Sequence, residues 1–190
     1  MAKVQRNTVI QGTSGALGDQ LVTRQDKAGR TTLMKKPTFS DDREFSTAQK
    51  GQQGSFREAM LYAKSAVKRE TIYAELAEGT PRTAYNVAIS DWFHLPEVGE
   101  IDLSGWTGQA GEIIRVEAVD DVMVVRVMVV ISDEGGMTIE KGEARQVDGV
   151  WWEYVTTRAA PGSARVIGVA EDLAGHVGER AAGLNRGGAE

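Results

Sequence analysis

Three glycines, Gly12, Gly15 and Gly18, recur at every third position after an apolar stretch, which is a spacing found in phosphate-binding loops. Such a loop leads into a helix N-terminus and is usually accompanied by a Lys-Ser/Thr pair or by a distal acid that holds the ribose. Here the segment runs into a strand-like stretch, 20–24, with no crossover helix. We therefore interpret these glycines as tight-turn residues and expect no cofactor.

His94 follows Asp91 by three residues, and a His/Asp pair can act as a general base. No nucleophile stands at a suitable spacing, and the aromatic residues between the pair are typical of packing. His176 falls in a predicted terminal turn and is interpreted as structural too. The sequence thus predicts no catalytic residues and a protein that is not an enzyme.

Acidic residues cluster at 120–121 and 133–134, and Asp172 lies near another strand end. Carboxylates at strand ends can converge on calcium, which takes six to eight oxygen ligands. None of these residues fits a known calcium-loop spacing, so we interpret them as solvated turn residues and expect no metal site. Whether they bind calcium stays open at this point.

Five basic residues flank a predicted hairpin, namely Arg24, Lys27, Arg30, Lys35 and Lys36. Nucleic acid is an obvious partner for such a group, but the hairpin lacks aromatic residues for base stacking and the sequence pI is near 5.2. We expect no nucleic-acid partner, and we interpret this group as a solvated or self-docking surface.

The composition describes an ordinary globular chain of 190 residues, 41% hydrophobic and 26% charged, with a net charge of −5. The absence of cysteine excludes a disulfide scaffold, thiolate metal sites and a cysteine nucleophile. The longest apolar run, 122–131, is interrupted by Arg126 and is too short to span a bilayer as a helix. We expect synthesis in the cytoplasm without a signal peptide and no membrane insertion, with the final location open, including release by a non-classical route.

The front of the chain predicts strands at 4–10, 20–24 and 31–34, with Gly29 in the hairpin turn. Residues 46–93 predict helices. Ser46 and Gln49 fit a capping box, and the apolar stripe consists of Phe56, Ala59, Met60, Ala63 and Val67. A short helix closed by Gly79 follows, and then a third helix capped by Thr80 and ending before Pro96.

From residue 97 the apolar period changes to two, with strands predicted at 100–103, 113–118, 122–132, 138–144, 150–157 and 165–171. Their spacing is typical of a β-sandwich. The predicted fold class is α+β, with an N-terminal β-hairpin and small helical unit in 1–96, an antiparallel β-sandwich in 97–178, and a flexible tail in 179–190.

The strand at 122–132 is apolar on both of its faces. Alternation assigns Val125, Val127, Val129 and Ile131 to the core, which leaves Val124, Arg126, Met128 and Val130 on the outer face. Trp151 likewise points away from Trp152 and Tyr154. An outer sheet face normally carries polar residues, so we expect this one to be covered, either by the chain's own helical unit or by another copy.

Charge is divided unevenly along the chain. Residues 1–70 carry 13 Lys/Arg against 7 Asp/Glu, whereas residues 71–190 carry 9 against 20. A basic front and an acidic back can attract one copy to the next, although two domains of different composition would produce the same division.

The stretch 97–176 resembles a bacterial immunoglobulin-like domain in Asp120-Asp121, in Trp152-Glu-Tyr154 and in the closing segment 170–176. That segment is similar to the family's A-x-D-x-x-G-N, with His176 in place of asparagine. The front resembles an uncharacterised bacterial family that begins with a G-x-x-G-x-x-G hairpin, followed by a proline, here Pro37, and a Gln-rich helix entry, here 48–53. The resemblance implies that the predicted antiparallel β-sandwich in 97–178 is immunoglobulin-like and that the chain is a non-enzymatic module.

The function predicted from these observations is that of a structural protein that associates with itself, into a filament or another regular assembly. The N-terminal strand or hairpin would pair with a neighbour's sheet. The predicted contact residues are Val124, Met128, Val130, Trp151, Arg30, Lys35 and Lys36. The alternative is a monomeric immunoglobulin-like module that binds a protein or glycan through Trp106 and Trp151.

Overall fold

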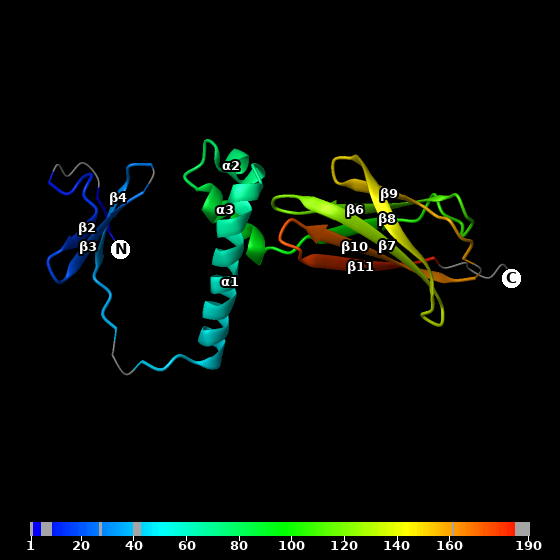
Figure 1. Ribbon diagram of the computed structural model, residues 1–190, viewed down its shortest axis with the longest axis horizontal. Helices are drawn as coiled ribbons and strands as arrows, with labels where there is room; N and C mark the ends of the chain where they lie inside the picture. Colours follow the sequence, from blue (N-terminus) through cyan, green and yellow to red (C-terminus); the bar gives the residue numbers. More distant parts are fainter. Residues whose placement is uncertain (1, 5–8, 27, 40–42, 161, 185–190) are drawn as a thin grey trace. The chain divides into compact units, whose positions relative to one another are not determined.

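The computed structural model describes residues 2–4, 9–26, 28–39, 43–160 and 162–184. The chain divides into two compact units, residues 1–88 and 89–190 (Figure 1), so the division falls inside a helix and slightly before the predicted boundary at 96/97. The fold class is α+β, as predicted: a small N-terminal sheet, a helical unit and an antiparallel β domain.

The N-terminal sheet contains four short strands in the order β1-β4-β3-β2. They are β1 (Ala2–Val4), β2 (Gly15–Leu17), β3 (Leu21–Gln25) and β4 (Thr31–Lys35). The β3–β4 hairpin is confirmed, and Gly29 has the positive φ of 75° that its turn requires. The strand predicted at 4–10 is wrong at its end, where residues 9–10 form a turn, and residues 5–8 lie outside the described residues. The strand β2 was not predicted.

The helical unit comprises α1 (Thr47–Arg69), α2 (Ile72–Ala77) and α3 (Ala84–Phe93), which crosses into the second unit. The predicted capping box of α1 is confirmed, with Gln49 N donating to Ser46 Oγ at 3.2 Å and Ser46 N to Gln49 Oε1 at 3.0 Å. The cap predicted at Thr80 is wrong. The side chain that caps α3 is Thr83, whose Oγ1 accepts from Asn86 N at 3.1 Å.

The predicted apolar stripe of α1 is only partly buried. The buried residues are Ala59, Ala63 and Ala66, whereas Phe56 is 48% exposed and Met60 43% exposed. The buried positions of α1 are thus all alanines, and the larger apolar residues of the predicted stripe are more exposed.

The β domain forms one seven-stranded antiparallel sheet in the order β11-β10-β7-β8-β9-β6-β5. Its strands are β5 (Glu97–Asp102), β6 (Ile113–Val119), β7 (Val124–Asp133), β8 (Thr138–Asp148), β9 (Trp151–Val155), β10 (Ala164–Asp172) and β11 (Val177–Leu184). The first part of β8 pairs with β7 and its last residues pair with β9. The strand β8 therefore begins in one of the two layers seen in Figure 1 and ends in the other. The domain is therefore sandwich-like, with β11, β10 and β7 in one layer and β9, β6 and β5 in the other.

The core between the layers contains Trp106, Ile114, Val116, Val127, Val129 and Ile131, with Trp152 and Tyr154 from β9. The predicted inward alternation of β7 and β9 is therefore confirmed at these positions. Trp106, predicted as an exposed binding residue of the alternative function, is 1% exposed, so that assignment is wrong.

The predicted tail at 179–190 is wrong in its first part, because residues 179–184 belong to β11. This strand pairs with β10 from Ala164↔Leu184 to Glu171↔Val177, and Arg180 donates a hydrogen bond to the Gly99 carbonyl of β5. The composition of 177–184, mostly glycine, alanine and charge, does not reveal a strand that is held chiefly by its backbone. Residues 185–190 lie outside the described residues.

Candidate interaction surfaces

Four apolar side chains gather on the outer face of the β domain, and we call them the outer-face patch: Met128 and Val130 of β7, and Ile167 and Val169 of β10. Strand pairing sets Met128 directly opposite Val169 and Val130 opposite Ile167, so they form a compact two-by-two array. All four are half-buried and none belongs to the core cluster. An outer face of this kind normally carries polar side chains, so the array marks a surface suited to a partner.

Charged side chains frame the outer-face patch. On the β8 side, Glu143 pairs with Met128 and Lys141 with Val130. On the β11 side, Glu179 pairs with Val169. Glu143 and Glu179 make no ion pair with any residue that the structure describes, so the Met128–Val169 row ends in a carboxylate on each side. The charge of Arg126, which forms its ion pair with Glu171, also acts on Glu143.

One predicted contact residue, Val124, lies on the other face of the sheet. A β-bulge between Glu171 and Asp172 pairs Val124 with Asp172 and leaves Val125 unpaired. Val124 consequently packs against the core, whereas Val125 is 39% exposed. The predicted orientation of both residues is therefore wrong.

Trp151 is half-buried and points away from the core, as predicted, but it lies apart from the outer-face patch in the strand order. It pairs with Glu117 on β6 and Asp148 on β8, next to the ion pair between Arg115 and Glu153. The structure thus brings Met128 and Val130 together and leaves Trp151 on a mainly polar part of the other layer.

The N-terminal sheet has almost no core of its own. Of the side chains described between residues 9 and 39, only those of Thr23 and Thr31 are buried. Its larger apolar side chains stay accessible: Leu17 is 48% and Leu21 40% exposed, and these two residues are direct partners across β2 and β3. A small sheet without an apolar interior is marginal in water and needs another surface to lie on.

The basic contact residues of this sheet are not equivalent. Arg30 is already engaged, because its Nε lies 2.7 Å from Asp26 Oδ2 and its backbone N–H donates to Asp26 Oδ1 at 2.9 Å. These contacts lower the pKa of Asp26, the backbone hydrogen bond from Arg30 most of all. Lys36 has a distant contact with Asp19 at 3.9 Å. Lys35 makes no ion pair within the described residues and lies directly opposite Leu21.

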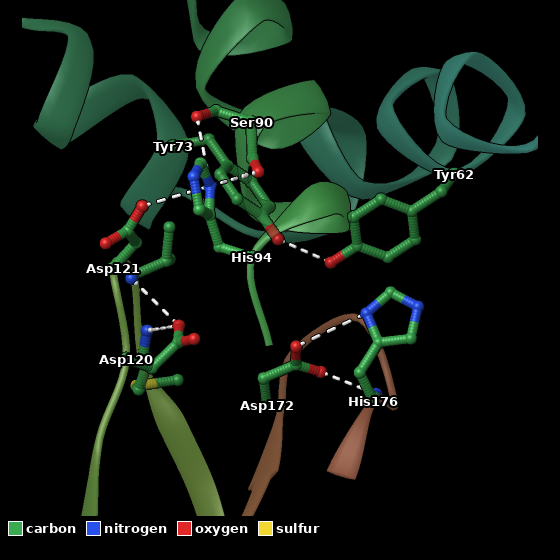
Figure 2. Close-up of polar contacts among 10 residues, drawn as sticks. Tyr62, Tyr73, Ser90, His94, Asp120, Asp121, Asp172 and His176 are labelled. Atoms are coloured by element: carbon green, nitrogen blue, oxygen red, sulfur yellow. Dashed lines mark hydrogen bonds and ion pairs between the residues drawn. The ribbon is translucent and has the colours of Figure 1, made fainter. Parts of the chain in front are cut away.

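The His94 environment does not have the geometry of a catalytic triad. His94 Nδ1 lies 2.7 Å from Ser90 O, 3.1 Å from Asp121 Oδ2 and 3.5 Å from Ser90 Oγ (Figure 2). A triad places the acid and the hydroxyl on opposite ring nitrogens, and here both face the same one. The side chains of His94 and Asp121 are also 57% and 60% exposed. These contacts fix the end of α3.

The second histidine belongs to the β10–β11 turn. Asp172 Oδ1 accepts from His176 N at 2.7 Å, and Asp172 Oδ2 lies 3.5 Å from His176 Nδ1 (Figure 2). The Trp92 ring stacks edge-on against His176 at 4.7 Å. Burial raises the pKa of Asp172, the neighbouring Asp120 adds to the rise, and hydrogen bonds and charge from the His176 side oppose it. The pair holds the turn, and Asp172 Oδ2 and His176 Nδ1 are buried without a hydrogen bond.

The other acidic residues serve their own turns. Asp120 Oδ2 accepts from Val122 N and Met123 N, both at 2.9 Å, and Asp133 Oδ1 accepts from Met137 N at 2.8 Å. Within the described part of the chain, no group of three or more acidic or histidine side chains could hold a metal ion. No helix in that part is long and apolar enough to cross a membrane.

The three N-terminal glycines lie in turns or at the start of a strand. This agrees with their interpretation as tight-turn residues. Gly12, Gly15 and Gly18 have φ values of 81°, 128° and 63°, which favour glycine. Gly15 begins β2, and Gly18 is in the tight turn before β3.

Two residues of the outer-face patch, Ile167 and Val169, were not predicted from the sequence. The signal for them is present in the segment Arg165-Val-Ile-Gly-Val-Ala, where both alternating sets are apolar, as in β7. Only the pairing of β7 with β10 shows that the two outer sets are neighbours.

No family model and no curated protein matches the chain. Among solved structures, it is similar to a tetra-tandem repeat from the extending region of a large adhesion protein, at 18% identity and a TM-score of 0.33, covering 48% of this chain and 23% of that one. It is also similar to an engineered protein (14%, TM-score 0.36, covering 55% and 24%) and to a conjugative transposon lipoprotein from Bacteroides eggerthii (15%, TM-score 0.28, covering 49% and 97%). With TM-scores below 0.5, these likenesses decide neither fold nor function. The chain spans about a quarter of the length of the first two.

Proposed function

We propose that this protein is a structural protein that associates with itself through its N-terminal sheet, and that it is not an enzyme. The observation that carries the proposal is that none of the apolar side chains described between residues 9 and 39 is buried. Burying a fully exposed leucine is worth ~1.5–3 kcal/mol, so covering the exposed part of two neighbouring leucines, Leu17 (48%) and Leu21 (40%), favours association by roughly half of that amount for each.

The division of charge supports the proposal. Unit 1 carries 14 Lys/Arg against 9 Asp/Glu, a net of +5, and unit 2 carries 8 against 18, a net of −10, which together give the chain's −5. Copies that meet through unlike units attract each other, whereas like units repel.

The alternative, a monomeric immunoglobulin-like module that binds a protein or glycan, has weaker support. One of its two aromatic candidates, Trp106, is buried, and Trp151 stands alone between acidic neighbours. We therefore favour self-association.

The test is light scattering after size exclusion, over a range of protein concentrations at low and high salt, with negative-stain microscopy of the heaviest fraction. We expect species heavier than the 20.5 kDa chain that grow with concentration and shrink in high salt. Leu17→Asp combined with Leu21→Asp should return the protein to a monomer, while Leu95→Asp, the same change at a residue that is 65% exposed in unit 2, should not. A wild-type chain that stays at 20.5 kDa throughout would refute self-association.

A further inference from the structure

We propose that the outer-face patch is the docking surface for the N-terminal sheet of a second copy of this chain. The inference rests on the proposed self-association and adds the surface that receives the sheet. Each copy would then offer one sheet and one patch, and the two surfaces are different from each other.

The shape of the β domain suits such a partner. The outer-face patch extends across β7 and β10, and a hollow of about 600 Å³ adjoins it, with Ile167 and Ala181 among its lining residues. Asp133, Glu134 and Arg165 also line this hollow. Apolar side chains beside two carboxylates fit a partner surface that combines apolar and basic side chains, whose charge would lie nearer the carboxylates than Arg165.

The N-terminal sheet presents that combination. Leu17 pairs with Leu21, and Leu21 pairs on its other side with Lys35, so one row across the sheet reads Leu-Leu-Lys. Partners in an antiparallel pair point to the same face, so all three side chains are on one face.

The rows of the two surfaces are complementary. Across the β domain one row reads Glu143-Met128-Val169-Glu179, which is an apolar pair with a carboxylate at each end. When the leucine pair lies on the apolar pair, Lys35 comes to one of these carboxylates. Lys35, Glu143 and Glu179 all make no ion pair with described residues of their own chain, so none has to give up such a pair.

The experiment mixes full-length chains of natural and 15N isotope content and treats the assembled protein with a carbodiimide, which joins an amine to a carboxylate only in direct contact. We expect a cross-link from Lys35 to Glu143 or Glu179 in which half of the linked pairs carry mixed isotopes. If both linked peptides always carry the same isotope, the cross-link forms within one chain and the sheet lies on its own β domain. This result overturns the inference.

Charge exchange is the second arm and needs no apolar residue to be disturbed. Glu143→Lys combined with Glu179→Lys should weaken association about tenfold, and adding Lys35→Glu to these changes should restore most of it. The control Val155→Lys adds a positive charge at a residue that is 54% exposed on β9, away from the patch and the hollow, and should leave association unchanged. Melting temperatures of all variants check that they fold.

The outcomes separate the two proposals. If the Leu17/Leu21 variant prevents assembly while the Glu143/Glu179 variant and a Val169→Glu variant assemble normally, the docking surface is wrong and self-association stands. If the wild-type chain never exceeds the mass of a monomer, both proposals fail.

Discussion

The change Gly178→Ala tests how β11 closes the β domain. A Cβ at this position would lie 2.9 Å from the carbonyl carbon of Pro96 and nearer still to its oxygen, whereas real Cβ atoms almost never come within 3.0 Å of another heavy atom. The obstacle is backbone and Pro96 is buried, so no side chain can rotate out of the way. Either β11 or the start of β5 must move.

The cost follows from what holds these segments in place. β11 is bound along its length to β10, and Gly178 pairs with Ala170, which is fully buried. Forcing an extra methyl group into such a site usually costs about 1–3 kcal/mol, and we expect the upper part of this range because both neighbours are fixed. The hydrogen bond from Arg180 to Gly99 would be strained by the same movement.

The assay is urea unfolding followed by tryptophan fluorescence. Gly51→Ala is the control for adding a methyl group without a clash, because a Cβ there meets nothing within 4 Å, and it should not destabilise the protein. Hydrogen exchange should also show β5 and β11 losing protection before β7 and β10 do. If Gly178→Ala unfolds with the same free energy as the wild type, within about 0.3 kcal/mol, β11 does not lie against Pro96 as described.

Three further substitutions have definite expected results. Gly51→Ala and Gly54→Ala should each stabilise α1 by about 0.5–1 kcal/mol, since both positions are open and helical, and a loss of helical signal on heating that comes earlier than in the wild type would contradict this. Asp172→Asn should stabilise the β domain by about 1 kcal/mol at neutral pH, because an amide can donate to the unpaired Nδ1 of His176 and carries no buried charge. The raised pKa of Asp172 means that the wild type loses stability as pH rises above the ordinary value of 3.8, so the advantage of asparagine in urea unfolding should shrink toward pH 4 and an unchanged difference would refute the assignment.

Most strands of the β domain could be predicted because two signals agree along them. Apolar residues alternate, and glycine, aspartate or proline separates one run from the next, so β6, β7 and β10 begin and end within two residues of the predicted positions. β11 lacks the first signal. It carries glycine and alanine at four of its eight positions and is defined by its pairing with β10, which no local pattern contains.

The predicted face of a strand residue is wrong where a β-bulge inserts one extra residue into the alternation of the strand. The bulge opposite Val124 and Val125 exchanges the two faces at the start of β7, and nothing in the residue types of the strand indicates it. The helical stripe of α1 fails for another reason. The prediction is confirmed at Ala59 and Ala63 and wrong at Phe56 and Met60, because hydrophobicity ranks large side chains as core residues without showing whether the fold leaves room for them.

Only two of the four residues of the outer-face patch could be predicted from the sequence. An apolar outer set on β7 is visible in the sequence, and it identified Met128 and Val130. Their neighbours Ile167 and Val169 follow far along the chain, and the pairing that joins them is a property of the folded sheet. Trp151 was also predicted as an apolar residue on an outer face, and yet it lies on another part of the sheet. The residue types of a strand do not show which strand lies beside it.

The proposed contact also determines how assembly should depend on concentration and salt. A sheet and a patch are different surfaces, so joining them leaves one free sheet and one free patch at the ends of every oligomer, and growth continues unless the ends meet in a ring. A two-fold symmetric dimer would instead use the same surface on both copies, and assembly would stop at two copies. A mass distribution that broadens steadily with concentration therefore favours the sheet-on-patch contact, whereas a sharp dimer contradicts it. Salt should lower the mass without abolishing assembly, since it screens Lys35 and its carboxylate partners but leaves the burial of Leu17 and Leu21 intact.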